Sequence, residues 1–253
     1  MNQEYRKLIA DEFRNCVDST ISRITNNEQT YRPFHTALLS QEAVFWSAFE
    51  RSFSTSFGQR VIEQIAKLVA LSNGAENAER QVETNIEIDV AYEDAIHRYM
   101  QNLRAHNPNA QRAWQPALAQ IMAVPTSGQL VKIRVISDLW WRKNGVNNYI
   151  SLKTVKPNID QTEIAKIDCL HLKIANPNCN TYFGLPYNPY GENKTDYAHN
   201  PPMGIFDFRN DPVVLIGQEM WDTIGGVGCY DELLDIAARV GAETREKIRN
   251  IRM

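Results

Sequence analysis

Hydrophobic residues recur at helical spacing through much of the first half of the chain. In residues 4–25 they return every three or four positions, which is the spacing of one buried helix face. The same reasoning predicts helices over residues 34–50, 56–71, 92–105 and 114–124, with breaks at Asn, Gly or Pro. We expect the 34–50 helix to pack on the core through Leu38, Leu39, Val44, Phe45 and Phe49.

A different pattern, with a period of two, predicts strands. Residues 82–90 (VETNIEIDV) and 131–136 (VKIRVI) alternate apolar and polar positions, whereas residues 75–81 are predicted to form a loop. Further strands are expected at 181–185, 206–208 and 213–216, and helices at 159–174 and 218–224, with a helix pair over 230–251. The fold class that follows is α/β, a mixed central β-sheet flanked by helices.

We expect residues 1–253 to form one domain, because no low-complexity tract interrupts the chain. Within it, residues 1–130 are mostly helical, residues 131–175 hold a β-hairpin and a helix, and residues 176–253 are rich in loops.

The segment 131–158 (VKIRVISDLWWRKNGVNNYISLKTVKPN) is organised around Asn144-Gly145, a pair that favours a two-residue β-hairpin turn. If Lys143 pairs with Val146, the register places Asp138 opposite Ser151. Lys153 then lies on the same face as Ser151 and diagonally from Asp138, roughly 7 to 8 Å away.

An acid and a lysine on neighbouring strands suit phosphate chemistry. The Asp138 carboxylate could hold a divalent metal, and the Lys153 ammonium could orient or deprotonate a water molecule or stabilise a pentavalent transition state. The alternative is a surface hairpin with an ordinary cross-strand polar pair.

Beyond this pair, the chain resembles the PD-(D/E)xK nuclease superfamily, and in particular type II restriction endonucleases of the TdeIII-like group. The matching elements are Asp138 at the end of a strand, the Asn144-Gly145 turn and the following residues 151–158 (SLKTVKPN). Residues 52–63, 183–191 and 217–221 are also similar to that group.

The resemblance implies a restriction endonuclease that requires Mg²⁺ and hydrolyses double-stranded DNA. In such a site Asp138 and the Leu152 carbonyl would bind the metal, and Lys153 would position or activate the attacking water. It also implies a homodimer that cuts a palindrome, for example an interrupted site such as GGNCC.

One departure concerns the second metal ligand. The superfamily has an acid two residues before the lysine, where this chain has Ser151, a poor metal ligand. The resemblance offers Glu63 on the upstream helix, or an acid displaced to the following helix, Glu163 or Asp168. The sequence does not choose among them.

Glu87 and Asp89 form a secondary metal candidate. They share the polar side of the 82–90 strand, a spacing that would allow both carboxylates to approach one cation. An exposed strand face explains the same pattern.

Candidate DNA contacts follow the hairpin. Lys156 suits a phosphate and Asn158 a base edge. The long irregular segment 186–202 (PYNPYGENKTDYAHNPP) adds aromatic and polar side chains that could stack on bases or reach phosphates, namely Tyr187, Asn188, Tyr190, Lys194 and Tyr197. The alternatives are exposed loop residues, a lid or a dimer contact.

Composition changes this picture only locally. The net charge is −3, but residues 131–173 contain eight Lys or Arg against four Asp or Glu, which suggests basic charge around the candidate site. The four cysteines have no metal-binding spacing and are expected to be buried thiols. No apolar stretch is long enough for a membrane span, and the first residues lack a signal-peptide pattern, so we expect a cytoplasmic protein without membrane contact.

Two other functions are compatible with the same residues. One is a nuclease of DNA repair or recombination that recognises DNA structure, and the other is a DNA-binding protein whose nuclease site has decayed at Ser151.

Overall fold

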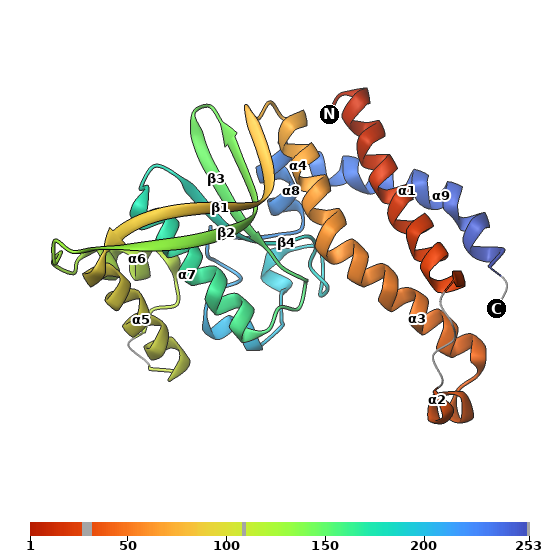
Figure 1. The fold of residues 1–253 in the computed structure, drawn as a ribbon, viewed down its shortest axis with the longest axis horizontal. Helices are drawn as coiled ribbons and strands as arrows, with labels where there is room; N and C mark the ends of the chain where they lie inside the picture. The colour runs from red at the N-terminus through yellow and green to blue at the C-terminus, as the bar shows by residue number, and fades with distance from the viewer. Residues whose placement is uncertain (27–31, 108–109, 252–253) are drawn as a thin grey trace.

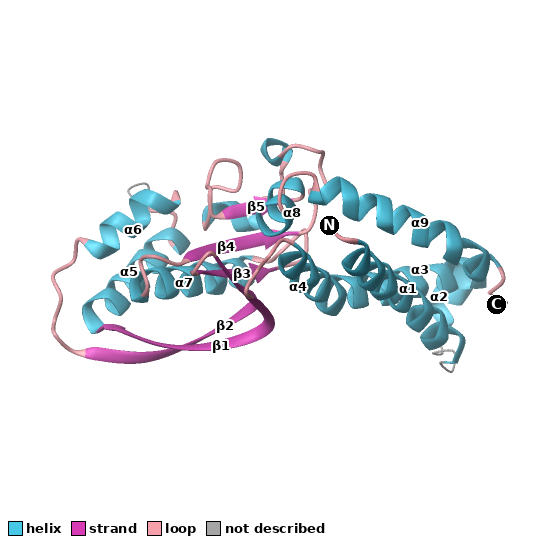
Figure 2. Ribbon diagram, turned by 90° about the horizontal axis from the view of Figure 1, so that it is seen from above, coloured by secondary structure: helices cyan, strands magenta, loops and turns pink. Residues whose placement is uncertain are grey.

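A five-stranded mixed sheet lies at the centre of the chain (Figures 1 and 2). In this computed structural model, which describes residues 1–26, 32–107 and 110–251, the strands follow the order β1-β2-β3-β4-β5. β1, β2 and β3 are antiparallel neighbours, and β4 and β5 continue the sheet in parallel. The strands are β1 (Asn77–Asp89), β2 (Leu130–Lys143), β3 (Val146–Leu152), β4 (Asn180–Leu185) and β5 (Val214–Ile216). The predicted α/β class is confirmed.

Side-chain alternation divides the core into two main clusters, one on each side of the sheet. Phe183 and Leu185 of β4 belong to the cluster that includes α5 (Val90–Arg104), α6 (Trp114–Met122) and α7 (Ile159–Ala175). Ile150 of β3 and Leu215 of β5 belong to the other, with α4 (Ile62–Ser72) and α8 (Gln218–Gly225). The candidate hairpin is therefore supported by helices on both faces.

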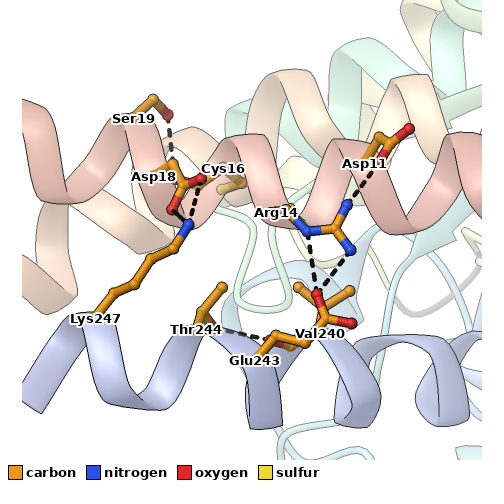
Figure 3. A network of polar contacts seen from close by, with 9 residues as sticks. All are labelled: Asp11, Arg14, Cys16, Asp18, Ser19, Val240, Glu243, Thr244 and Lys247. Atoms are coloured by element: carbon orange, nitrogen blue, oxygen red, sulfur yellow. Dashed lines mark hydrogen bonds and ion pairs between the residues drawn. The ribbon is translucent and has the colours of Figure 1, made fainter.

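Two long helices, α1 (Gln3–Asn26) and α9 (Cys229–Arg249), run beside each other beyond one end of the sheet (Figure 1). Polar contacts join them, as Figure 3 shows: Lys247 binds Asp18 at 2.8 Å, and Arg14 binds Glu243 at 2.8 Å. α9 is a single helix, so the predicted helix pair over 230–251 is wrong. Gly241, the residue that could divide the segment, lies inside the helix with negative φ, and Leu233, Ile236 and Val240 are buried while Leu234 is 52% exposed.

The predicted helix over 34–50 is divided and does not pack as expected. α2 (Pro33–Leu38) ends before α3 (Gln41–Ser56), and Ser40 caps the start of α3 by accepting a hydrogen bond from the Ala43 amide. None of the described residues in α2 and α3 is buried, and Phe34 and Leu38 are 80% and 82% exposed. The prediction of core packing there is therefore wrong.

The boundary expected near residue 56 is a continuous helix instead. α3 passes through a π-helical turn, η1 (Phe57–Val61), directly into α4. Val61, Ile65, Leu68 and Val69 form the buried stripe that the sequence predicts.

Two further expectations are wrong. β1 begins at Asn77, so most of the predicted 75–81 loop is strand, held by its backbone ladder to β2. Residues 206–208 form no strand, because Phe206 and Phe208 are fully buried as anchors of an irregular segment. The long segment after β4 is irregular as predicted, with short turns η2 (Lys194–Asp196) and η3 (Pro201–Gly204).

All four cysteines are buried and free, as expected. Among the described residues, no helix combines the length and apolarity needed to cross a bilayer.

Candidate active site

The hairpin between β2 and β3 has the predicted register. Lys143 pairs with Val146 and Leu139 with Ile150. Asn144 and Gly145 have φ values of 50° and 74°, and positive φ at both central residues is what a type I′ turn requires. The turn therefore sets which side chains of β2 and β3 face each other.

This register brings Asp138 and Lys153 into direct contact. The Lys153 ammonium donates to Asp138 Oδ2 at 2.9 Å, and the Leu152 amide donates to the same oxygen at 2.7 Å. The Ser151 hydroxyl adds a longer contact of 3.3 Å. The side chains of Asp138 and Lys153 are 17% and 23% exposed, so the pair is partly shielded yet reachable from solvent.

The strand that carries Lys153 is fixed from its other side by β4. The Lys153 amide donates to the Gly184 carbonyl at 3.0 Å. A Cβ at Gly184 would lie 2.6 Å from Ile150 Cδ1 and 3.0 Å from Leu152 Cδ2. Because Gly184 has no side chain, the ends of the Ile150 and Leu152 side chains can occupy the space beside it.

Glu63 joins the site through an unexpected residue, Gln81 of β1. The Gln81 side-chain amide donates to Glu63 Oε1 at 3.0 Å and to Asp138 Oδ1 at 3.1 Å. Burial raises the pKa of Glu63; the hydrogen bond from Gln81 opposes this change and the charge of Asp138 adds to it. Glu63 and Asp138 are therefore two acids held near each other by one amide.

Sequence reasoning missed Gln81, which it placed in a loop. The only signal in the chain is indirect: an antiparallel pairing of β1 with β2 that continues to Asn77 places residue 81 across from residue 138. That signal requires knowledge of the pairing itself.

Two acids of α7 were offered as alternatives to Glu63. Asp168 lies close enough to Asp138 and Lys153 for both charges to affect its pKa. Burial raises its pKa to about 6, Lys153 lowers it and Asp138 raises it. Glu163 instead binds Arg104 of α5 at 2.5 Å. The structure thus associates Asp168 with the site and connects Glu163 to α5.

Glu87 and Asp89, the secondary metal candidates on β1, have separate structural contacts. Asp89 is buried and caps α5 by accepting from the Ala91 amide, and it also accepts from Ser127 and Gly128. These hydrogen bonds, chiefly from the Ser127 amide, lower its pKa to about 2. Glu87 forms an ion pair with Lys132 at 3.7 Å. Asp89 is therefore a structural cap, and the expectation that it shares a metal site with Glu87 is wrong.

Two of the candidate DNA contacts meet beside the hairpin. The Lys156 ammonium lies over the Tyr190 ring, 5.5 Å from its centroid. Tyr190 is 41% exposed and Tyr187 is 45% exposed. The segment that carries them is attached directly after Lys153, since the Tyr197 hydroxyl donates to the Val155 carbonyl and His199 donates to the Pro157 carbonyl, both at 3.0 Å.

Other candidates in this region have structural contacts. Asn158 caps α7, where its side chain accepts from the Gln161 amide. Asn188 donates to the Asn193 carbonyl within its own loop. The Lys194 ammonium binds the carbonyls of Asp211 and Val214 and lies 3.0 Å from Glu219.

Tyr197 is fully buried, stacked on Phe208 with ring centroids 4.9 Å apart. The expectation that this ring could stack on a base is wrong, because it is an anchor of the loop.

The positive charge of residues 131–173 is largely compensated within the fold. Lys132 and Arg134 pair with acids of β1, Arg142 pairs with Glu76 just before that strand, and Lys166 is fully buried. The expectation that this segment concentrates basic charge around the site is therefore wrong, because antiparallel pairing places Glu87, Glu83 and Glu76 beside it.

The donor chemistry of the site fits a hard divalent cation. Glu63 and Asp138 present two carboxylates whose mutual repulsion a cation would relieve, and Mg²⁺ typically uses one or two carboxylates together with waters and substrate phosphates. Within the described ranges, no three residues among His, Cys, Asp and Glu form a group that could hold a metal ion. Any cation here would thus need other oxygen ligands.

Comparison with known proteins places the chain in a family. The model of the type II restriction endonuclease HinfI family matches residues 1–241. The chain belongs to the HinfI family of type II restriction endonucleases. Three restriction enzymes of Herpetosiphon aurantiacus are similar to this HinfI-family chain along nearly their whole length.

The type II restriction enzyme HgiEI is 29% identical over 254 residues, which is 96% of this chain and 90% of that enzyme. HgiBI is 29% identical over 247 residues, covering 94% and 88%, and HgiCII is 27% identical over 237 residues, covering 92% and 85%. No solved structure matches this HinfI-family chain.

Proposed function

We propose that this HinfI-family chain is a Mg²⁺-dependent endonuclease that hydrolyses phosphodiester bonds of double-stranded DNA at a specific sequence, with a PD-(D/E)xK-type site. The observation that carries the proposal is the arrangement around Asp138. One carboxylate oxygen accepts from Lys153 and the other faces Glu63 across the Gln81 amide. The resemblance to the TdeIII-like group supports the same site.

Asp138 and Glu63 would hold the cation, together with the Leu152 carbonyl. Leu152 ends β3 with its amide directed at Asp138, and a strand residue presents its carbonyl on the same edge as its amide. When bound, Mg²⁺ would stabilise charge on a phosphoryl oxygen and make a bound water more acidic.

Lys153 would act on the nucleophile. Its ammonium is held by Asp138, and from there Nζ would orient or help to deprotonate the attacking water, or stabilise the charge on the phosphorane. Ser151, which stands where the superfamily has an acid, would keep Asp138 in place through its hydroxyl.

For the second carboxylate we favour Glu63. It shares a hydrogen-bond donor with Asp138, whereas Glu163 is paired with Arg104. Asp168 lies near both central charges, and a raised pKa suits an acid that exchanges protons near neutral pH.

DNA contact is proposed for the surface next to Lys153. Lys156 would bind a phosphate, and Tyr187 and Tyr190 would contact sugars or bases. Asn158, Asn188 and Lys194 would contribute by shaping this surface, since each already binds the protein.

The target would be a short palindrome, for example an interrupted GC-rich site such as GGNCC. A homodimer with one site per strand matches the two-fold symmetry of such DNA. Cytoplasmic location would give the enzyme access to incoming DNA.

The experiment is digestion of a plasmid of known sequence with the purified chain, with Mg²⁺ and with a chelator. We expect discrete fragments that appear only with Mg²⁺. Smears or nicks at junctions would instead indicate a structure-specific nuclease, and DNA binding without cleavage would indicate a decayed site; either result would contradict the proposal.

A further inference from the structure

Gln81 occupies an unusual backbone position directly across from Asp138. The register pairs Arg80 with Leu139 and Val82 with Ser137, so residues 81 and 138 are opposite each other. Gln81 is the fifth of thirteen residues in β1 and has a φ of 52°. Non-glycine residues adopt such values at an energetic cost, and such residues cluster at functional sites.

With this backbone conformation, the side-chain amide of Gln81 lies between the carboxylates of Glu63 and Asp138. Its Nε2 atom is 3.0 Å from Glu63 Oε1 and 3.1 Å from Asp138 Oδ1. Both hydrogens of this group are used, one for each acid. The amide therefore stabilises two like charges that would otherwise repel each other.

The distances from Nε2 to the two carboxylate oxygens are close to the distance between neighbouring ligand atoms around a metal ion. Mg²⁺ binds oxygen at about 2.0 to 2.1 Å with octahedral geometry, so neighbouring ligands lie about 2.9 Å apart. The position of Nε2 has this spacing from both carboxylate oxygens. An oxygen atom at that position would suit a hard cation, whereas an amide nitrogen that donates its hydrogens would not.

We propose that Gln81 is a third oxygen ligand of the divalent cation, after a half-turn of its carboxamide. This rotation exchanges Nε2 and Oε1, and the terminal torsion of glutamine is soft and roughly two-fold. Gln81 then has two roles: the amide nitrogen bridges the carboxylates before the cation binds, and the amide oxygen binds the cation afterwards. The inference rests on the proposed function, because it assigns the cation to Glu63 and Asp138.

The role of Gln81 also accounts for the third metal ligand, because Ser151 stands where the superfamily has an acid. No three acidic, histidine or cysteine side chains are grouped for a metal among the described residues. A glutamine oxygen from the neighbouring strand supplies a neutral ligand in place of that acid.

The test is calorimetric titration of the intact protein with Mn²⁺ alone, without DNA. Gln81→Gly removes the ligand while tolerating the positive φ, and Gln81→Glu keeps an oxygen but cannot donate. Asn144→Gly is the matched control, because Asn144 also has a positive φ, of 50°, in the hairpin turn. Thermal denaturation of each variant checks that it is folded.

We expect Gln81→Gly to weaken Mn²⁺ binding about tenfold or more, Gln81→Glu to bind at least as tightly as the wild type, and Asn144→Gly to be unchanged. Wild-type or tighter affinity in Gln81→Gly, or weaker binding in Gln81→Glu than in Gln81→Gly, would overturn the inference.

Asp138→Asn separates this inference from the proposed function. If Asp138→Asn loses Mn²⁺ binding and Gln81→Gly does not, only the role of Gln81 is wrong. If Asp138→Asn keeps wild-type affinity, the cation binds elsewhere and both proposals fail.

Discussion

The two carboxylate oxygens of Asp138 have different neighbours. Oδ2 accepts from Lys153, the Leu152 amide and Ser151, while Oδ1 accepts only from the Gln81 amide among the hydrogen bonds of the described residues. The first oxygen therefore fixes the side chain within the hairpin, and the second is directed toward Glu63. Asp138 lies within β2 and not, as was expected from the sequence, at the end of a strand, and in this position it can connect a lysine and a second acid from different elements.

Removing either member of the central pair should stop cleavage. We expect Lys153→Ala and Asp138→Ala to lower the cleavage rate by about 100- to 10,000-fold or more, because each removes a group that acts on the reacting phosphate or water. Specific DNA binding should remain largely intact. The measurement is single-turnover cleavage of a duplex, with binding followed separately by gel shift.

Lys143→Ala provides the control for that experiment, since Lys143 lies in the same hairpin beside the turn. It should cut at the wild-type rate. Normal cutting by Lys153→Ala or Asp138→Ala would show that the residue concerned has been assigned a wrong role.

At the scale of elements, Asp89 connects strand, helix and loop. It ends β1, caps α5 and accepts hydrogen bonds from Ser127 and Gly128 ahead of β2. The two longest strands of the sheet are therefore held together at the end far from the hairpin turn.

Asp89→Asn should destabilise the protein in a manner that depends on pH. The pKa of Asp89 is lowered from 3.8 to about 2 by its hydrogen bonds. Its contribution to stability is thus complete above about pH 4 and is lost as the pH falls toward 2. Asparagine can still cap α5, but it lacks the charge and the second acceptor oxygen that binds the Gly128 amide, so we expect a Tm about 2 to 4 °C lower at pH 7, with the difference narrowing below pH 4.

The measurement is thermal unfolding followed by circular dichroism across this pH range. Glu87→Gln, an exposed neighbour in the same strand, should show little change at any pH. An equal loss of Tm at pH 7 and at pH 3 would mean that the charge of Asp89 does not contribute.

Elements with strong local signals were predictable from the sequence. The helix expected over 92–105 is α5 (Val90–Arg104), and the Asn144-Gly145 turn alone gave the register that joins Asp138 to Lys153. Local signals are sufficient there because side-chain periodicity and turn geometry are properties of neighbouring residues.

Elements determined by tertiary contacts were not predictable. Residues 77–81 lack apolar alternation and become strand because β2 supplies backbone partners. Phe206 and Phe208 alternate like a strand but are buried anchors. Gln81 was not predictable for two reasons. Its position opposite Asp138 depends on the pairing of β1 with β2, and neither this pairing nor its positive φ can be read from the neighbouring residues.

At the scale of the molecule, the sheet and the helices around it are accompanied by a helical region formed by α1, α3 and α9 beyond one end of the sheet (Figure 1). None of the described residues of α3 in this region, or of the adjoining α2, is buried. Each chain has one Asp138–Lys153 pair, so under the proposed function two chains would supply one site for each strand of the duplex.

We expect the protein to form a homodimer, with a mass near twice the chain mass of 29.0 kDa in size-exclusion chromatography with light scattering. The physical reason is the match between two-fold symmetric DNA and two copies of one site. A mass of one chain, with and without duplex DNA and up to micromolar concentration, would contradict this expectation.

The close approach of β3 and β4 at Gly184 limits how this enzyme can vary. A methyl group there would lie 2.6 Å from Ile150 Cδ1 and 3.0 Å from Leu152 Cδ2, so the ends of these side chains would have to move. In the loop that follows β4, exposed side chains such as Tyr187 and Tyr190 can be replaced without a comparable clash, whereas the buried Tyr197 cannot. Libraries that diversify the neighbouring loop to obtain new cleavage preferences should therefore keep this glycine constant.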